Sequence, residues 1–293
     1  MRSVPSSGTP HDMVEILDLE IVGDDRFRGF CPPTRGTRIF GGQVVAQALA
    51  AAQKTVPEAR SAHSLHGYFM LGGDPAVPID FVVERMRDGR SFSTRRIVAL
   101  QAERCIFSMA ASFQIEEEGF EHAAVMPDVP EPEALESGTE IVEAALKRGL
   151  DLPGRMWLDE RPMEFRPVTP EHYVSTRRLP PEQHLWLRMT GPLPADAGGR
   201  AATLAYLSDM ALLDTALFAH GTSVFADDLQ AASLDHAVWF HRPPPLEDWL
   251  LYTADSPTAT GARGLARGML FSRDGLLVAS TAQEGLIRKR ANA

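Results

Sequence analysis

The second half of the chain repeats the plan of the first half, and this duplication limits the folds that the chain can adopt. The segment AHSLHGYF is matched by ASLDHAVWF, and IFSMAASFQ is matched by GLLVASTAQ, at an offset of roughly 170 residues. A repeat of that length is a duplicated domain rather than the unit of a solenoid. The 293 residues are therefore expected to form two domains of similar design.

Each half is predicted to contain one apolar helix and an antiparallel sheet. In the first half, two glycines open the run FGGQVVAQALAAAQ, which has apolar residues at helical spacing. Strands are expected at 79–86, 92–100 and 105–115, with an Asp-Gly turn after the first. In the second half, the run AYLSDMALLDTALFAHG is expected to be a helix, with strands before and after it. This pattern indicates an α+β architecture in which a sheet wraps around each helix.

The composition changes between the two halves. The stretch EEEGFEHAAVMPDVPEPEALESG is acidic and contains prolines, which is typical of an exposed linker. Near its end, Ser137 and Glu140 precede an apolar run and predict a short helix. We therefore place an N-terminal unit at 13–118, an acidic linker at 119–163 and a C-terminal unit at 164–290.

Charge and cysteine content exclude several classes of protein. A net charge of -10 disfavours binding to nucleic acid or to an anionic membrane, because both require a basic face. Cys31 and Cys105 alone provide neither a disulfide framework nor a zinc pattern. The chain shows no signal peptide and no run long enough to span a membrane, so we expect a cytoplasmic protein.

Eight motifs distributed over both halves resemble the acyl-CoA thioesterase II family. They occur in the expected order: FGGQVVAQAL, HSLHGYF, RDGRSFSTRR, LSDM, SLDHAVWFHRP, DWLLY, ARGLARG and VASTAQEG. The resemblance extends from about Phe27 to Arg288 and is interrupted by the acidic linker. It implies a double hotdog fold, in which each of two tandem units has a central helix inside a curved antiparallel sheet.

The resemblance also implies three catalytic residues, all in the second half. They are Asp209 of LSDM, Ser233 just before LDH, and Gln283 of TAQEG. Some members of the family have Thr in place of Ser233, which keeps the hydroxyl group. Read from the residues alone, Asp209 also suits a helix N-cap, and Ser233 and Gln283 suit hydroxyl and amide groups bonded within a sheet.

The three side chains together can hold one water molecule, with Asp209 as the general base that takes its proton. Backbone N–H groups near a helix start are expected to face the developing oxyanion. A serine nucleophile is disfavoured, because the chain lacks a G-x-S-x-G elbow and because neighbouring residues such as Asp235 and His236 point to opposite faces of a strand. The histidines show no metal-ligand spacing, and we expect neither a metal nor a cofactor.

The first half is expected to lack an active site. Ser64 matches Ser233 and Gln114 matches Gln283, but no acid stands near Phe40 where a counterpart of Asp209 would fall. The matched positions of His66 and His236 suggest a structural role for both histidines. One active site per chain is therefore predicted.

The predicted function is hydrolysis of acyl-CoA to a fatty acid and CoA. Two alternatives remain: an enoyl-CoA hydratase on the same fold, which would need an Asp–His pair, and a non-catalytic acyl-CoA sensor.

A homodimer or higher homo-oligomer is expected, with acyl-CoA as the substrate. The candidates to bind the CoA phosphates are the arginines of the strand and turn regions: Arg87, Arg90, Arg95, Arg96, Arg263 and Arg267. Candidates for the acyl slot are Met210, Leu213, Trp239 and Phe240.

Overall fold

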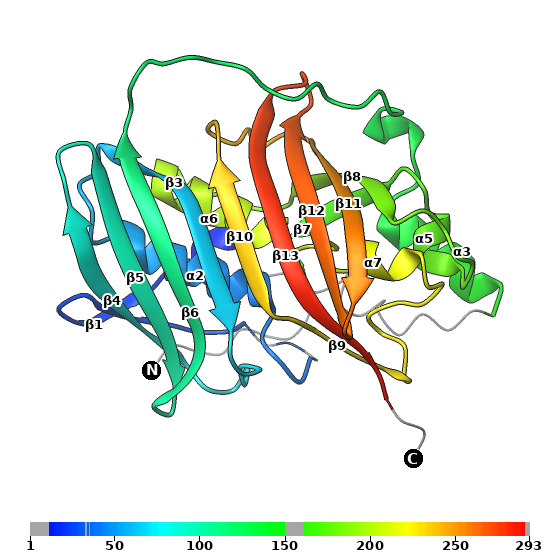
Figure 1. The fold of residues 1–293 in the computed structure, drawn as a ribbon, viewed down its shortest axis with the longest axis horizontal. Coiled ribbons are helices and arrows are strands. Elements are labelled where there is room, and N and C mark those ends of the chain that lie inside the picture. Colours follow the sequence, from blue (N-terminus) through cyan, green and yellow to red (C-terminus); the bar gives the residue numbers. More distant parts are fainter. Residues whose placement is uncertain (1–11, 33, 35, 150–160, 291–293) are drawn as a thin grey trace.

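A single antiparallel sheet runs through the computed structural model, with the central helices behind it (Figure 1). The model describes residues 12–290 apart from 33, 35 and 150–160. Along the sheet the strand order is β1-β2-β4-β5-β6-β3-β10-β13-β12-β11-β8-β7, and the short strand β9 also pairs with β13. Strands of the first half thus occupy one end of the sheet, and strands of the second half occupy the other.

The N-terminal half surrounds one helix. After α1 (Met13–Ile16), its strands are β1 (Glu20–Gly23), β2 (Arg26–Gly29), β3 (Arg60–Phe69), β4 (Ile79–Asp88), β5 (Phe92–Gln101) and β6 (Arg104–Ile115). The helix α2 (Gly41–Gln53) is buried along nearly its whole length, and its many alanines let the sheet approach closely. A helix that is buried on nearly all sides must be enclosed, which is why the sheet curves around it, and the buried amides of Gln43 and Gln47 donate to the backbone carbonyl of Phe30.

The C-terminal half repeats this plan around α6 (Ala197–Ser208). Its other elements are β7 (Met163–Pro167), α5 (Glu171–Val174), β8 (Glu182–Met189), α7 (Thr215–Phe218), β9 (Leu229–Ser233), β10 (Asp235–Phe240), β11 (Leu250–Thr260), β12 (Arg263–Ser272) and β13 (Leu277–Lys289). The two halves together match the double hotdog architecture that the resemblance implies.

The helix expected over AYLSDMALLDTALFAHG is wrong in its extent. The helix α6 begins earlier, with Asp196 as its N-cap, and it ends at Ser208. Beyond it the backbone is irregular, and Ala211 has a positive φ of 58°. The apolar run continues past the helix end because Met210 and Leu212 are buried in the core, so periodicity alone could not reveal the break.

The two halves join at the centre of the sheet, where β3 and β10 pair antiparallel. The register places His236 opposite Gly67 and His66 opposite Ala237. The two histidines therefore face opposite sides of the sheet, His236 fully buried and His66 exposed. The two histidines therefore have different surroundings although the sequence pattern aligns them, and the structural role expected for both stays a prediction.

The segment between the halves crosses the top of the view in Figure 1 and returns to the C-terminal half. Most of its described residues are exposed, as the acidic composition predicts. It carries η1 (Pro132–Ala134) and α3 (Gly138–Lys147), the short helix that the sequence predicts, and Ser137 and Glu140 form a capping box at its start. The Trp186 indole N–H donates to the carbonyl of Pro130 at 2.9 Å, which attaches the segment to the sheet.

Candidate functional site

A cavity of about 530 Å³ lies where the two halves meet, and Asp209, Ser233 and Gln283 all line it. This volume lies within the range of small-molecule sites. The N-terminal half contributes the segment that leads into α2, and the C-terminal half contributes the irregular backbone after α6 together with β9 and β13. The other lining residues are Thr34, Gly36, Thr37, Arg38, Ile39, Phe40, Gly41, Arg161, Ala211, Leu213, Asp214, Val224, Phe225, Ala231 and Ala232.

The sequence suggested that Asp209 caps the start of its helix. In the structure it is instead the C-cap of α6. Its carboxylate instead accepts the backbone N–H of Gly42 in the first turn of α2. A Cβ atom on Gly41 would lie 2.8 Å from Asp209 Oδ2, so glycine is what permits this approach. The base candidate thus comes from the C-terminal half, while the helix start that stabilises its charge comes from the N-terminal half.

Burial is the main influence on the Asp209 carboxyl, whose side chain is only 5% exposed. Removal from water raises its pKa from 3.8 to about 6, against the opposing effects of the Gln283 hydrogen bond, the Gly42 N–H and the charge of Arg161. A carboxylate with such a pKa is ionised at neutral pH and is basic enough to take a proton from a positioned water molecule.

Gln283 lies on β13 and is the direct partner of Asp209. Its amide Nε2 donates to Asp209 Oδ1 at 2.5 Å, although the two residues are far apart in sequence. The side chain is 1% exposed, and its Oε1 has no hydrogen-bond partner within the described residues. A buried amide oxygen in this condition requires a partner, and the adjoining cavity can supply a water molecule or a ligand.

Ser233 lies at the end of β9, where it pairs with Gly285 of β13. Its side chain is partly buried and lines the cavity. Across the described part of the chain, no direct hydrogen bond joins its hydroxyl to Asp209 or Gln283. Ser233 can therefore contact a molecule in the cavity, and of these two residues it is Gln283 that hydrogen-bonds directly to Asp209 in the described part of the chain.

The sequence reasoning missed Asp214, a second carboxyl in the same cavity. Burial raises its pKa from 3.8 to about 7, and the backbone N–H of Val224 opposes this shift. The signal was present in the sequence: Asp214 stands in the same apolar run as Asp209, where a carboxylate is costly. Arg38 and Arg161, which also line the cavity, were missed because they lie outside the strand and turn regions.

The N-terminal counterparts named by sequence do not form a similar site. Gln114 donates to Glu117 at 3.0 Å in an exposed contact. Ser64 lies on β3 opposite Trp239, whose side chain is exposed. Neither residue lines the cavity that holds Asp209.

Asp235 and His236 diverge, as their adjacent positions predicted. Asp235 accepts the backbone N–H of Glu284 at 2.7 Å and contacts His66, whereas His236 points into the core. They cannot act on one substrate atom. No group of three or more His, Cys, Asp or Glu side chains positioned to hold a metal ion occurs among the described residues.

Several arginines proposed for the CoA phosphates are engaged in ion pairs. Arg95 is fully buried and bonds Asp88, while Arg263 and Arg267 bond Glu284 and Asp255. Cross-strand pairing therefore accounts for these three.

Among the acyl-slot candidates, Leu213 lines the cavity, Met210 packs in the core and Trp239 is exposed on the other face of the sheet.

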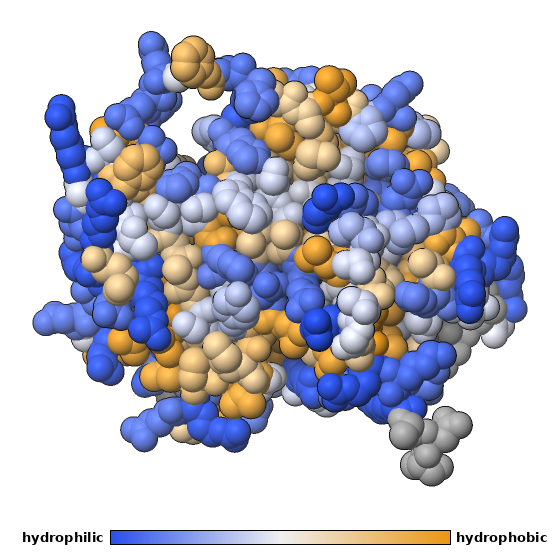
Figure 2. Space-filling view, viewed as in Figure 1, coloured by the Kyte–Doolittle hydropathy of each residue, from blue (hydrophilic) through white to orange (hydrophobic). Residues whose placement is uncertain are grey.

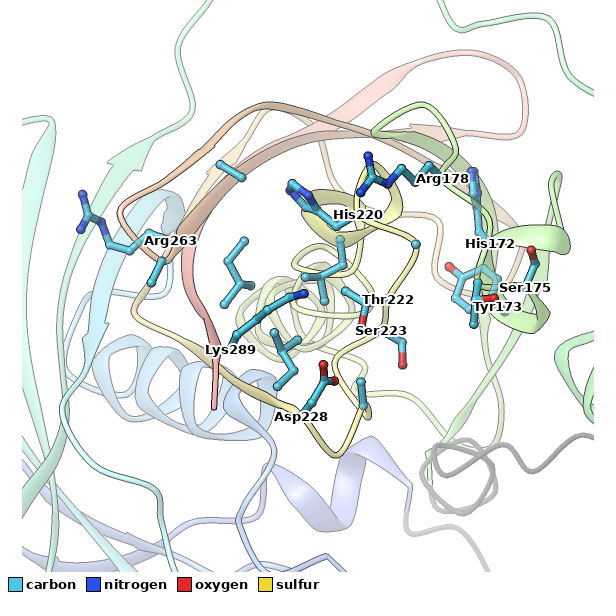
Figure 3. A pocket seen from close by; sticks show the side chains of 18 of the residues that line it. His172, Tyr173, Ser175, Arg178, His220, Thr222, Ser223, Asp228, Arg263 and Lys289 are labelled. Atoms are coloured by element: carbon cyan, nitrogen blue, oxygen red, sulfur yellow. The ribbon is translucent and has the colours of Figure 1, made fainter. Parts of the chain in front are cut away.

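A second pocket, of about 730 Å³, lies at the open end of the C-terminal half (Figure 3). It is separated from the first by the segment 223–226, which contributes residues to both. Basic side chains, among them Arg178, His220 and Lys289, stand around it with a single carboxyl, Asp228. It lacks the base and amide pair of the first cavity.

Comparisons with known proteins show which family this chain is similar to. Family models described as acyl-CoA thioesterase and as acyl-CoA thioesterase N-terminal domain match residues 155–286 and 32–114. Acyl-CoA thioesterase 2 of Haemophilus influenzae is 39% identical over 95% of this chain and 97% of its own length. Human acyl-coenzyme A thioesterase 8 is 40% identical over 93% of this chain and 88% of its own. The crystal structure of acyl-CoA thioesterase II TesB2 from Mycobacterium marinum superposes with a TM-score of 0.78 at 38% identity, covering 96% of this chain and 98% of that one.

Proposed function

The chain belongs to the acyl-CoA thioesterase family and is a thioester hydrolase, and we propose that it hydrolyses acyl-CoA with a water molecule activated by Asp209. The observation that carries this proposal is the Asp209–Gln283 pair, which lines the cavity and whose amide oxygen has no partner among the residues that the structure describes. No metal and no covalent enzyme intermediate is required, because a thioester is already an activated acyl group.

The hydrogen-bonding capacity of water fits this site. One water proton is given to Asp209 and the other to Gln283 Oε1, while the Ser233 hydroxyl donates to one lone pair of the water oxygen. The remaining lone pair is then directed at the thioester carbonyl carbon. As the C–O bond forms, the proton passes to Asp209 and negative charge collects on the carbonyl oxygen.

The developing oxyanion needs a donor, and the first turn of α2 offers one. The Gly42 N–H is used by Asp209, whereas the backbone N–H of Gly41 stands beside it in a residue that lines the cavity. We assign Gly41 to the oxyanion, since N–H groups at a helix start favour negative charge. When the C–S bond breaks, the CoA thiolate takes the proton from Asp209 and the carboxylate is regenerated.

Release of free thiol from short, medium and long acyl-CoA substrates tests this function. We expect turnover by the native chain and a loss of about 1,000-fold in kcat for Asp209→Ala. Turnover that is unchanged in that variant would show that Asp209 is not the base. Binding of acyl-CoA without thiol release would favour the sensor alternative, and loss of the conjugated double bond of an enoyl-CoA would favour the hydratase. Two observations argue against the hydratase: Asp235 and His236 diverge, and His236, whose Nδ1 lies 4.0 Å from Asp209 Oδ1, is fully buried and does not line the cavity.

We further propose the division into units at 13–118 and 164–290 with a linker at 119–163, of which 150–160 lie outside the described residues. The division is supported by the position of each half at its own end of the sheet. We also propose action in the cytoplasm, since two cysteines in the whole chain do not provide the disulfide framework that is typical of secreted proteins. Among the described residues, no helix has the length and apolar character needed to cross a bilayer.

We propose that two or more copies associate through the outer face of the sheet. At its centre, pale and apolar residues lie among hydrophilic ones in Figure 2, and the face exposes Tyr68 and Trp239. Strand register places small side chains around them: Ser64, Ser108, Ala110, Ser112, Ser280 and Ala282. Light scattering should give the mass of a dimer or larger oligomer, and Trp239→Glu should lower that mass. A native chain of monomer mass would contradict the proposal.

A further inference from the structure

The buried side chains behind Gln283 form a chain of hydrogen bonds whose proton positions can be deduced. It begins at Ser208, the last residue of α6, whose hydroxyl lies 2.9 Å from the carbonyl oxygen of Ala205. A carbonyl can only accept, so the single hydroxyl proton of Ser208 is directed at Ala205. The Ser208 oxygen is then left to accept from its other neighbour, the Nε2 atom of His236 at 2.8 Å.

This requirement fixes the tautomer of His236. Its Nε2 must carry the proton that Ser208 accepts, and in the neutral ring Nδ1 is therefore an acceptor. The ring is fully buried, and burial lowers its pKa from 6.5 to about 4, so it is neutral at physiological pH. The other titratable groups near it are Asp235 and His66 towards the outer face and Asp209, whose Oδ1 lies 4.0 Å from Nδ1.

The acceptor Nδ1 in turn binds the amide of Gln283. Gln283 Nε2 lies 3.2 Å from His236 Nδ1 and 2.5 Å from Asp209 Oδ1, so its two N–H bonds are given to two acceptors. The amide oxygen must then point away from both, and this is the buried Oε1 that has no partner within the described residues. The orientation of the amide thus follows from chemistry.

We propose that His236 is a positioning residue that holds the Gln283 amide in one orientation while Asp209 gains and loses a proton. The inference rests on the proposed function, in which Asp209 is protonated midway through turnover. A protonated carboxyl can donate a hydrogen bond, so Asp209 alone would then tolerate a flipped amide. Nδ1 of His236 has no proton to give, and it keeps the amide N–H groups inward and Oε1 towards the water site.

Two amide substitutions at position 236 separate positioning from packing. His236→Asn can place its oxygen near the position of Nδ1 and keep an acceptor for Gln283. His236→Gln reaches the position of Nε2, which keeps the Ser208 contact but removes that acceptor. We expect kcat to fall about tenfold in His236→Gln, the equivalent of one lost buried hydrogen bond, with KM little changed. His236→Asn should keep most of its kcat, although the shorter side chain leaves a larger void and should lower Tm more.

If His236 acted only in packing, the variant with the lower Tm, His236→Asn, would also have the lower kcat. That result would overturn the proposal. A double-mutant cycle provides the second measurement. In a Gln283→Ala background, His236→Gln should change kcat less than about twofold, since no amide remains to position. A full tenfold loss in that background would equally overturn the proposal. Failure of the proposed function is recognised separately, by an Asp209→Ala variant that retains native turnover.

Discussion

The two halves of the chain differ most in the connection that follows the central helix. In the N-terminal half, residues 54–59 carry the chain directly from α2 to β3. In the C-terminal half, residues 209–228 intervene between α6 and β9, and they contain Asp209, Asp214 and α7. The longer connection supplies the carboxyl groups of the cavity, whereas the shorter one contains no acid facing it.

The N-terminal half nevertheless takes part in the site. It supplies the first turn of α2, where Gly42 donates its N–H to Asp209 and Gly41 leaves space for the carboxylate. One unit thus holds the proposed base and its amide partner, and the other provides the helix start against which that carboxylate is placed.

The largest difference in kcat is expected between variants of Gln283 and Gln114, the two amides that the sequence repeat aligns. Gln283→Ala removes the partner of Asp209 and the acceptor for water, and kcat should fall about 100-fold. Gln114→Ala, in the N-terminal half, breaks only an exposed contact with Glu117 and should leave kcat unchanged. Steady-state thiol release measures both, and equal losses in the two variants would contradict a single site per chain.

Stability should respond in opposite directions to the removal of two aspartates. The pKa of Asp209 is raised to about 6 by burial, so its ionised form weakens the fold above that pH. This cost disappears as pH falls below about 4, where the carboxyl is protonated in both states. Asp209→Asn should therefore raise the free energy of unfolding at pH 8, by about 2 kcal/mol.

The matched control is Asp88→Asn in the N-terminal half. The hydrogen bonds from Ser93 and Arg95 hold the pKa of Asp88 below 3.8, so its ionised form stabilises the fold at pH 8. That substitution should lower the free energy of unfolding, because it weakens the only ion pair of the fully buried Arg95 found in the described part of the chain. Urea denaturation at pH 8 compares the two variants, and destabilisation by both would show that Asp209 is not under a burial cost.

The substitution Gly41→Ala tests whether the start of α2, in the N-terminal half, is needed to place Asp209. The added Cβ would lie 2.8 Å from Asp209 Oδ2, so the carboxylate must shift from its position. We expect kcat to fall about tenfold with a small change in Tm, since misplacement of a catalytic group is costly to rate. A variant with native kcat would mean that the approach of Asp209 to α2 is not needed for turnover.

The smallest effect concerns the nucleotide of CoA. Arg38 lines the catalytic cavity, and Arg38→Ala should raise KM for acyl-CoA about threefold, as expected for one exposed phosphate contact. KM for an acyl-N-acetylcysteamine thioester, which lacks phosphates, should not change. Lys289→Ala in the second pocket is the control. If only the Lys289 variant raised KM for acyl-CoA, the phosphates would lie in the second pocket instead.

Much of this organisation could be predicted from sequence. The repeat of two similar halves is visible in the sequence. The glycine pair at the start of α2, the short helix after Ser137 and the divergence of Asp235 and His236 depend on local patterns, and the structure agrees with each of them. Asp209 was placed at the wrong end of a helix because the residues after Ser208 remain apolar and contain no glycine or proline before Gly221. Their irregular backbone is held by tertiary packing, which leaves no periodic signal.

Sequence patterns could not predict the contacts between the two halves. The Gly42 N–H that meets Asp209 comes from another helix, and the Gln283 amide comes from a distant strand. The pairing of His236 with Gly67 depends on the register of two strands from different halves. Such contacts are set by the folded geometry, so the sequence could name these residues without showing which of them meet.

The pH dependence of kcat/KM shows whether Asp209 is the base. The free enzyme should show an acidic limb with a pKa of about 6, below which kcat/KM falls about tenfold for each pH unit, because a protonated carboxyl cannot accept a proton from water. Asp214→Asn should keep that limb, and Asp209→Asn should abolish it together with most of the activity. An acidic limb that survives in Asp209→Asn and is lost in Asp214→Asn would assign the base to Asp214 and contradict the account.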